Sequence, residues 1–298
     1  MSAVVGLIGL GAMGRPMAAN IARAGFDLQV FDTRHQATAA LMEAGAHAAA
    51  STESLGEACD WIVFSLPDTA AVAASVAELE PVLRAGQILI DCGTTDPGFS
   101  AEAAVRLGRD GVTFLDAPVS GMPVRAETGT LTIMVGGDEG AYHKVGPLLQ
   151  ALGSEIVHMG APGNGQLMKI TNNVLYNVAL AAMAEILPLA VKAGLDPETV
   201  CRVISAGTGK SVAFDYFAPR LLRRDFSEGY SMHSAHKDMI AVMDLAQRYG
   251  VPLPVASGAA HTYQLALDRG LGPESKAAMA KVWEEALGVE VKAKGQED

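Results

Sequence analysis

Near its start the sequence reads Val4-Val5-Gly6-Leu7-Ile8-Gly9-Leu10-Gly11-Ala12-Met13-Gly14. The apolar, β-branched run is typical of a buried strand, and the closely spaced glycines are typical of a turn that opens a helix. In that context Gly9 permits a tight turn, Gly11 lets the backbone approach a pyrophosphate, and Gly14 lets the helix pack closely on the strand. The run therefore predicts a dinucleotide site, with Gly9, Gly11, Ala12, Met13 and Gly14 at the cofactor.

An acidic residue ends the next predicted strand. A carboxylate at Asp32 would accept hydrogen bonds from the adenosine ribose hydroxyls, which favours NAD over NADP. Arg34 argues in the other direction, because a guanidinium pairs well with a 2′-phosphate. We predict NAD as the cofactor and keep NADP as the alternative.

Outward from this motif, short β-rich runs alternate with alanine-rich stretches that suit helices. Glycine, proline, aspartate or serine bounds each run. The alternation predicts an α/β fold, in which a doubly wound, Rossmann-type parallel sheet comes first. The predicted strands are Val4–Ile8, Leu28–Phe31, Trp61–Ser65, Ile88–Asp91, Thr113–Asp116 and Leu131–Val135.

From residue 163 the pattern changes to long helical segments, of which Gln166–Ala193 is the longest. A chain of 298 residues exceeds the usual size of one domain. We expect a dinucleotide-binding domain at residues 1–162 and an all-helical domain for substrate binding and oligomerisation at residues 163–298. The tail after Val289 is charged, and we expect it to fray.

Composition excludes several classes of protein. Half of the residues are hydrophobic and 18% are charged, as in a packed globular enzyme. A formal net charge of -11 opposes nucleic-acid binding, which depends on cations that meet phosphates. The uncharged runs are too short and too polar to predict a membrane span, and we see no export signal. Three widely spaced cysteines indicate reduced thiols, and we expect a cytoplasmic protein.

Further motifs give the chain a family likeness. They are Gly6–Gly14, Asp116-Ala-Pro-Val-Ser-Gly121 followed by Gly129-Thr-Leu131, then Gly165-x-x-x-Lys169-x-x-x-Asn173, then His236-Lys237-Asp238. In this order and at this spacing the sequence resembles the β-hydroxyacid dehydrogenases over nearly its whole length. That family includes 3-hydroxyisobutyrate dehydrogenase, tartronate semialdehyde reductase and 2-(hydroxymethyl)glutarate dehydrogenase, and the last is also similar near Lys281-Val-Trp-Glu284. The motifs do not choose among these members.

The resemblance implies roles for single residues. Lys169 would be the catalytic acid and base, and Asn173 would orient the substrate or the lysine. Residues four apart share one face of a helix, so the spacing agrees with a joint role. The resemblance also implies that Ser120 and Gly121 hold the substrate carboxylate and that Lys237 closes over cofactor and substrate. Leu66, Pro67 and Thr94 would line the nicotinamide half of the cofactor.

The implied reaction is reversible hydride transfer between NAD(H) and a small β-hydroxy acid or its semialdehyde. The protein would bind a small carboxylate substrate and assemble as a homodimer or homotetramer. No metal is needed, since His233 and His236 lack a nearby carboxylate ligand set.

The sequence departs from the family in the loop after Gly121, where relatives usually carry two more glycines. Here those places hold Met122 and Arg125. A methionine cannot adopt positive φ without cost, and its side chain takes space where backbone would otherwise meet the substrate. We therefore expect Met122 to narrow the substrate pocket. Arg125 either points to solvent, the commoner fate of a loop arginine, or selects a substrate with a second anionic group.

Two other functions remain open from the sequence. One is an imine reductase with a similar two-domain plan, which would carry another residue in place of Lys169. The other is a non-catalytic dinucleotide-sensing module, against which the acidic charge and the Lys169–Asn173 pair both count.

Overall fold

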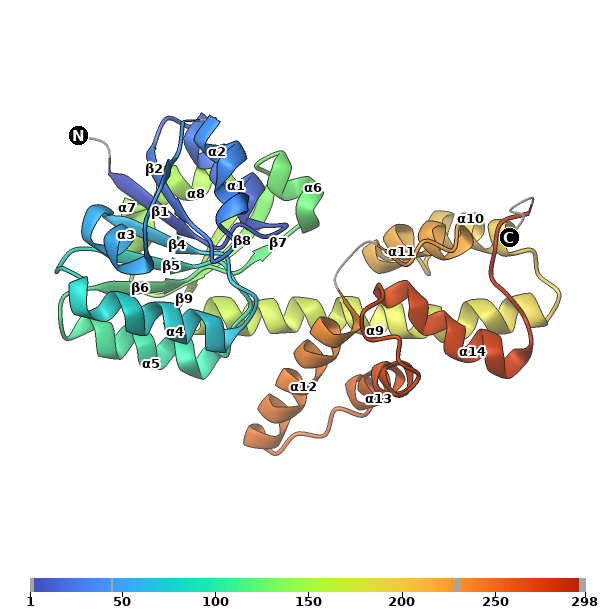
Figure 1. The fold of residues 1–298 in the computed structure, drawn as a ribbon. Helices are drawn as coiled ribbons and strands as arrows, with labels where there is room; N and C mark the ends of the chain where they lie inside the picture. The colour runs from blue at the N-terminus through green and yellow to red at the C-terminus, as the bar shows by residue number, and fades with distance from the viewer. Residues whose placement is uncertain (1–2, 44, 228–230, 295–298) are drawn as a thin grey trace. The chain divides into compact units, whose positions relative to one another are not determined.

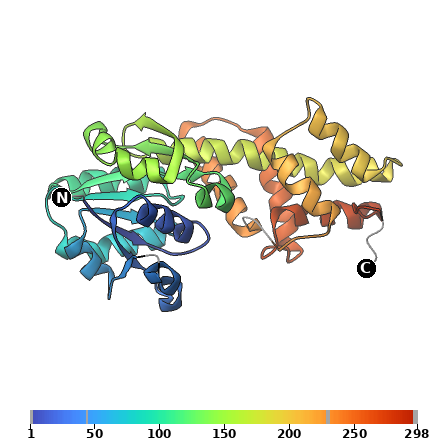
Figure 2. The ribbon, with the colours of Figure 1, turned by 90° about the horizontal axis from the view of Figure 1, so that it is seen from above.

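The computed structural model describes residues 3–43, 45–227 and 231–294. The chain divides into two compact units, Met1–Lys169 and Ile170–Asp298, here called the N-terminal and the C-terminal unit. Helix α9 (Asn164–Lys192) begins in the first and continues through the second. Figures 1 and 2 show it as one unbroken helix.

The described part of the N-terminal unit holds one sheet of nine strands in the order β3-β2-β1-β4-β5-β6-β8-β7, with β9 paired to β8. The first six strands pair in parallel, and the antiparallel pairs are β6 with β8 and β7 with β8. The strand order reverses at β1, which has β2 on one side and β4 on the other. The strands are β1 (Val4–Ile8), β2 (Asp27–Phe31), β3 (His47–Ala48), β4 (Trp61–Phe64), β5 (Ile88–Asp91), β6 (Thr113–Asp116), β7 (Val119–Ser120), β8 (Leu131–Gly136) and β9 (Gly153–Gly160).

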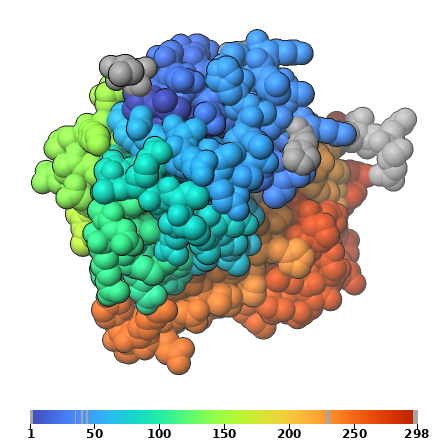
Figure 3. All heavy atoms as spheres, turned by 60° about the vertical axis from the view of Figure 1, so that its left-hand side comes forward, coloured from blue at the N-terminus to red at the C-terminus, as the bar shows by residue number. Residues whose placement is uncertain are grey.

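Both faces of this sheet are buried. Successive side chains of a strand point to opposite faces, so Leu7 lies in one core cluster and Ile8 in the other. Figure 3 shows one outer face of the molecule, on which the blue to cyan part of the chain is visible. Helices cover each face of the sheet (Figure 1). They are α1 (Gly14–Arg23), α2 (Ala39–Glu43), α3 (Thr52–Ala58), α4 (Thr69–Leu79), α5 (Pro97–Gly108), α6 (Met122–Glu127), α7 (Glu139–Lys144) and α8 (Gly146–Leu152), with short 3-10 turns η1 (His35–Thr38) and η2 (Glu80–Val82). The predicted doubly wound sheet is confirmed.

The C-terminal unit is helical, as predicted. Leu187 of α9, Phe217 of α11 and Tyr263 of α13 lie in its core. Its helices are α9, α10 (Pro197–Ala206), α11 (Val212–Leu222), α12 (Met232–Tyr249), α13 (Pro254–Asp268) and α14 (Ala280–Leu287), with the 3-10 turn η3 (Lys276–Met279).

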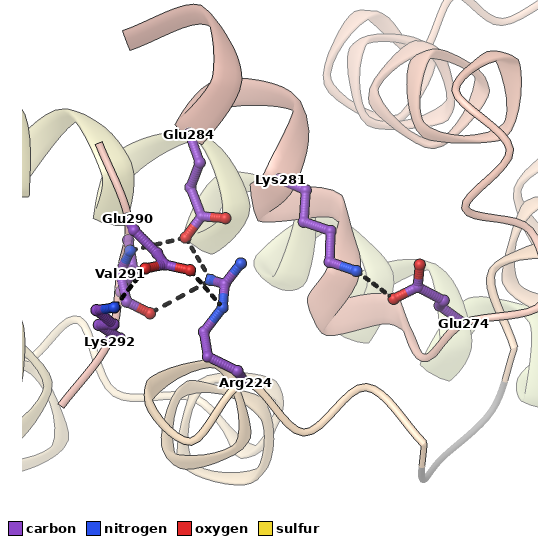
Figure 4. Close-up of polar contacts among 7 residues, drawn as sticks. All are labelled: Arg224, Glu274, Lys281, Glu284, Glu290, Val291 and Lys292. Atoms are coloured by element: carbon purple, nitrogen blue, oxygen red, sulfur yellow. Dashed lines mark hydrogen bonds and ion pairs between the residues drawn. The ribbon is translucent and has the colours of Figure 1, made fainter. Parts of the chain in front are cut away.

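The tail after α14 does not fray over its described residues, so that expectation was wrong for 290–294. Val291 is fully buried in the core of the unit. Its amide donates to Glu284 Oε1 at 2.7 Å, and Arg224 Nη1 donates to the same oxygen at 2.6 Å. Arg224 also pairs with Glu290, so one guanidinium holds the tail to α14 (Figure 4). The buried Val291 side chain and the Glu284 carboxylate, which Arg224 and the Val291 amide share, hold the segment in place although it is charged.

Lys281 and Glu284, from the segment singled out by the sequence, both make structural contacts. Lys281 pairs with Glu274 and lies 4.0 Å from the centre of the Phe226 ring, while Glu284 binds Arg224 (Figure 4). These contacts stabilise the C-terminal unit.

By length and composition alone, α9 would be able to cross a membrane, with 29 residues and a mean hydropathy of 1.8 in its most apolar window. The uncharged runs of the sequence did not predict such a helix, because Glu185 interrupts a segment that is apolar on either side of it. The same composition is typical of the central helix of a helical domain. Leu180, Ala184 and Leu187 lie in the core of the unit in that way.

The three cysteines are free thiols, and each is buried. Burial raises the pKa of Cys59 to about 12 and that of Cys201 to about 11. It raises the pKa of Cys92 still further above its ordinary value.

Candidate active site

The glycine turn has the geometry that a dinucleotide requires. Gly9 has φ 97°, and a side chain there or at Gly14 would collide with backbone oxygen, of Ser65 and of Gly9 respectively. At Gly11, by contrast, no described atom lies within 4 Å of the place where a Cβ would stand. Packing therefore requires glycine at the first and third places, while the second leaves open space beside the turn.

Helix α1 starts at this open space. Its N-cap residue, Met13, makes no side-chain cap, so no side chain occupies the amides that open the helix. Such amides, with the positive end of the helix dipole, bind phosphate groups. The turn and helix start thus fit a pyrophosphate, with Ala12 and Met13 between the second and third glycines.

Asp32 stands at the carboxyl end of β2, beside β1, and only 7% of it is exposed. It accepts the Leu10 amide at 2.7 Å and the Arg34 amide and Nε at 2.8 and 3.1 Å. Burial alone would raise its pKa, but the hydrogen bonds from Arg34 and Leu10 together hold the pKa below the ordinary value. Asp32 is therefore an anion at neutral pH, and Arg34 is already paired with it.

Leu66, Pro67 and Thr94 also follow the carboxyl ends of strands. Leu66 and Pro67 come after β4, and Thr94 comes after β5, the next strand in the sheet. Leu66 packs between two glycines, since side chains at Gly9 or Gly93 would meet its Cδ2 at 3.0 Å or its carbonyl oxygen at 2.9 Å. The structure thus brings Leu66 to the glycine turn, and Thr94 is partly exposed at the same edge of the sheet.

Ser120 ends the short strand β7 rather than lying in a loop, and it pairs in register with Thr132 of β8. The chain then turns sharply, because Gly121 has φ 142° and Met122 has φ 59°. Positive φ costs a residue with a side chain about 1 kcal/mol, so Met122 is held in a strained conformation. Met122 is half-buried at the first position of α6.

Two buried aspartates fix the start of α9, the helix that carries Lys169. Asp116, at the end of β6, accepts the Gly163 amide at 2.7 Å and the Gln166 amide at 2.9 Å. The Gln166 side chain donates to Asp91 Oδ2 at 3.3 Å and to the Gly93 carbonyl at 3.1 Å. Lys169 follows Gln166 by about one helical turn, so it starts from a fixed base.

Burial governs the ionisation of both aspartates. It raises the pKa of Asp91 to about 6, against hydrogen bonds from Thr95 and Gly93 that lower it. It also raises the pKa of Asp116, against the amides of Gly163 and Gln166. Sequence reasoning missed Asp91 and Gln166. The available signal was that two neighbouring predicted strands each end in aspartate.

In the C-terminal unit, Asn173 donates through Nδ2 to Asp238 Oδ2 at 2.8 Å. Asp238 lies on α12 and is 2% exposed, and the exposed Lys237 precedes it. The motif that contains Lys237 therefore supplies the partner that orients Asn173. Lys169 and Asn173 are four residues apart on the continuous helix α9 and fall on either side of the boundary between the units.

A surface depression of about 390 Å³ lies elsewhere in the N-terminal unit, between α7, α8 and β9. None of the predicted site residues lines it, and we assign it no part in the chemistry. Among the residues that the structure describes, no three His, Cys, Asp or Glu side chains gather closely enough to hold a metal ion.

Comparison with known proteins accounts for both units. Residues 4–160 match the family described as the NAD binding domain of 6-phosphogluconate dehydrogenase. Residues 163–283 match the family described as NAD-binding of NADP-dependent 3-hydroxyisobutyrate dehydrogenase. Together with the glycine turn, these matches define an oxidoreductase that uses NAD(P).

Individual relatives narrow the class. The chain is 36% identical to 2-(hydroxymethyl)glutarate dehydrogenase of Eubacterium barkeri over 96% of this chain and 97% of that protein. It is 33% identical to L-threonate dehydrogenase of Cupriavidus necator over 99% and 100%. The crystal structure of 3-hydroxyisobutyrate dehydrogenase from Salmonella typhimurium, 31% identical, superposes with a TM-score of 0.89 and covers 94% of this chain and 100% of that one. The chain belongs to the β-hydroxyacid dehydrogenase family.

Proposed function

We propose that the protein catalyses reversible hydride transfer between NAD(H) and a small β-hydroxy acid or its semialdehyde, with Lys169 as the general acid and base. One observation carries this proposal. Lys169 follows by about one turn a helix start that Asp116 and Gln166 hold to the carboxyl ends of β5 and β6. That edge of the sheet also carries the glycine turn, and a lysine held there suits proton transfer beside a dinucleotide.

The proton step belongs to Lys169. When bound, the nicotinamide supplies or accepts the hydride at the carbon that bears the substrate oxygen. In reduction the Lys169 ammonium donates a proton to that oxygen as negative charge develops on it. In oxidation the neutral amine accepts the proton of the hydroxyl group, which requires a lysine whose pKa falls toward the working pH.

Other residues bind and orient the substrate in this proposal. The Ser120 hydroxyl and the Gly121 amide donate to the substrate carboxylate. Asn173, whose amide group is already oriented by Asp238, donates to or accepts from the reacting oxygen or Lys169. Lys237 contributes a positive charge to the binding of cofactor and substrate, as the family resemblance implies.

The first experiment measures the absorbance of reduced nicotinamide with a panel of substrates. The panel holds the hydroxy acids for which the relatives are named, 2-(hydroxymethyl)glutarate, L-threonate and 3-hydroxyisobutyrate, together with the semialdehydes of the first and third and a set of cyclic imines. Turnover of a hydroxy acid is expected. The proposal is rejected if the enzyme turns over only imines, or if it binds NAD but turns over no substrate of the panel.

Replacement of Lys169 tests the assigned role. Lys169→Ala should lower kcat by about 100-fold or more, the usual scale of a positioned acid or base. The affinity for NADH, followed by its fluorescence, should stay nearly intact. Lys192→Ala, at the exposed end of the same helix, is the matched control and should leave kcat unchanged. An unchanged kcat in Lys169→Ala would remove this residue from the mechanism.

A further inference from the structure

The side chain of Arg125 turns back over the Ser120–Gly121 turn. A Cβ at Gly121 would lie 2.8 Å from Arg125 Cβ, 2.9 Å from its Cδ and 3.2 Å from its Nε. The stem of the arginine therefore fills the space that the glycine leaves open. Arg125 is half-buried in this position instead of extending from the surface.

The guanidinium lies on the same face of the sheet edge as the Ser120 side chain. Its Nη1 is 3.4 Å from Thr132 Oγ1. Thr132 stands directly opposite Ser120 in the antiparallel pair of β7 and β8, and side chains of directly opposed residues project to one face about 5 Å apart. The Arg125 cation and the Thr132 hydroxyl thus lie beside the hydroxyl to which the proposed function assigns the substrate carboxylate.

The local backbone holds this arrangement. The positive φ of Gly121 and of Met122 forms the sharp turn into α6, which places Arg125 above the turn one helical turn later. Within the described ranges, no carboxylate forms an ion pair with Arg125. A guanidinium has five N–H donors in a planar fork, and the single long contact with Thr132 leaves most of them for an anion.

We infer that Arg125 binds a second anionic group of the substrate, so that the enzyme prefers small β-hydroxy acids with a distal carboxylate over those with an apolar side chain. This inference rests on the proposed function, since it takes Ser120 and Gly121 as the site of the first carboxylate. Arg125 here determines specificity and takes no part in proton or hydride transfer.

The test compares two substrates that differ only at the distal group, 2-(hydroxymethyl)glutarate and 2-(hydroxymethyl)pentanoate, in which a methyl group replaces the distal carboxylate. The wild type should prefer the dianion in kcat/KM. Arg125→Ala should reduce that preference by about ten-fold or more, through KM for the dianion, as expected when a charge-assisted pair is lost. Arg125→Lys should retain only part of the preference for the dianion, because an ammonium lacks the planar fork of N–H donors.

A matched control removes the same charge from the same unit. Arg109→Ala, at an exposed position after α5, should leave the preference as in the wild type. If Arg125→Ala lowers kcat/KM equally for both substrates, the residue binds the shared carboxylate or only supports the turn, and the inference is wrong. It is equally wrong if neither value changes.

Binding of unreactive acids separates this inference from the proposed function. Titration calorimetry in the presence of NAD should show that the wild type binds glutarate more tightly than butyrate and that Arg125→Ala loses the difference. That result with no turnover of any hydroxy acid would retain the anion site and reject the proposed reaction. Turnover of hydroxy acids, together with equal glutarate binding by the wild type and Arg125→Ala, would retain the proposed reaction and reject the anion site.

Discussion

Asp32 and Arg34 form one electrostatic group. Arg34 donates three hydrogen bonds to the Asp32 carboxylate, one from its backbone amide and two from its guanidinium, and the Leu10 amide donates a fourth. Arg34 is therefore held over Asp32. A 2′-phosphate approaching this position would meet the Asp32 charge and would have to take Arg34 from it. We therefore expect the pair to favour NAD, although an arginine is present.

Replacement of Asp32 should reverse this preference. Asp32→Ser removes the repulsion and frees Arg34, so the ratio of kcat/KM for NADP to that for NAD should rise about ten-fold or more. Asp27→Ser, at the exposed opposite end of the same strand, is the control and should leave the ratio unchanged. A wild type that prefers NADP and loses that preference in Arg34→Ala would show that the arginine dominates.

Sequence patterns predicted the candidate site residues whose proposed roles depend on local spacing. The glycines and Asp32 belong to one strand-turn-helix-strand unit, and Lys169 and Asn173 share one helix. Asp91 and Gln166 were missed because they meet across 75 residues of sequence, and neither has a local pattern that predicts the other. The fold of Arg125 over Gly121 depends on two positive φ values, one of them at a methionine, where sequence gives no reason to expect it.

At the scale of elements, strands with a buried, β-branched run were predicted to within about a residue. The strands β3, β7 and β9 were not. β3 and β7 have two residues each, and β9 is largely exposed. Such strands form because a partner offers a free edge, as β8 does to β7 and β9, rather than from their own propensity.

The anchor of α9 should make stability depend on pH. The raised pKa of Asp91 means that its protonated form is favoured in the folded state. This contribution is fully present below the unfolded pKa, near 4, and is lost as the pH rises through about 6. As the pH rises from the unfolded to the folded pKa, the free energy of unfolding falls by on the order of 3 kcal/mol relative to a chain that cannot ionise at this position.

Asp91→Asn should reveal this term in urea denaturation at several pH values. The lost hydrogen bond lowers the variant's free energy of unfolding at every pH, so the informative quantity is its difference from the wild type. That difference should shift in favour of the variant as the pH rises from 4 to 7. Asp110→Asn, at an exposed position, is the control. A difference that does not change with pH would show that folding does not raise the pKa of Asp91.

For the whole molecule, the two units have separate cores and unrelated architectures. Composition and periodicity predicted both. The docked tail was not predicted, because residues 290–294 carry charges typical of solvated segments and only Val291 is anchored in the core. Each unit also contains one of the two tryptophans, Trp61 in the first and Trp283 in the second.

These tryptophans allow the tail contact to be tested in its own unit. In a Trp61→Phe background, Trp283 fluorescence reports unfolding of the C-terminal unit. Glu284→Ala leaves Arg224 and the Val291 amide without their shared acceptor and should lower the free energy of unfolding by about 3 kcal/mol. Glu285→Ala, whose exposed ion pair with Arg269 contributes little, should change it by less than about 1 kcal/mol. Equal effects of the two variants would mean that the Glu284 carboxylate contributes no more to stability than an exposed ion pair does.

The buried cysteines have a consequence for how motion in this protein can be followed. Because burial keeps their pKa values far above neutrality, a thiol reagent reacts with them only after the surrounding structure opens. Cys59 and Cys92 belong to the N-terminal unit and Cys201 to the C-terminal unit. The rates at which the native chain is alkylated therefore record local opening of each unit separately, without any introduced label.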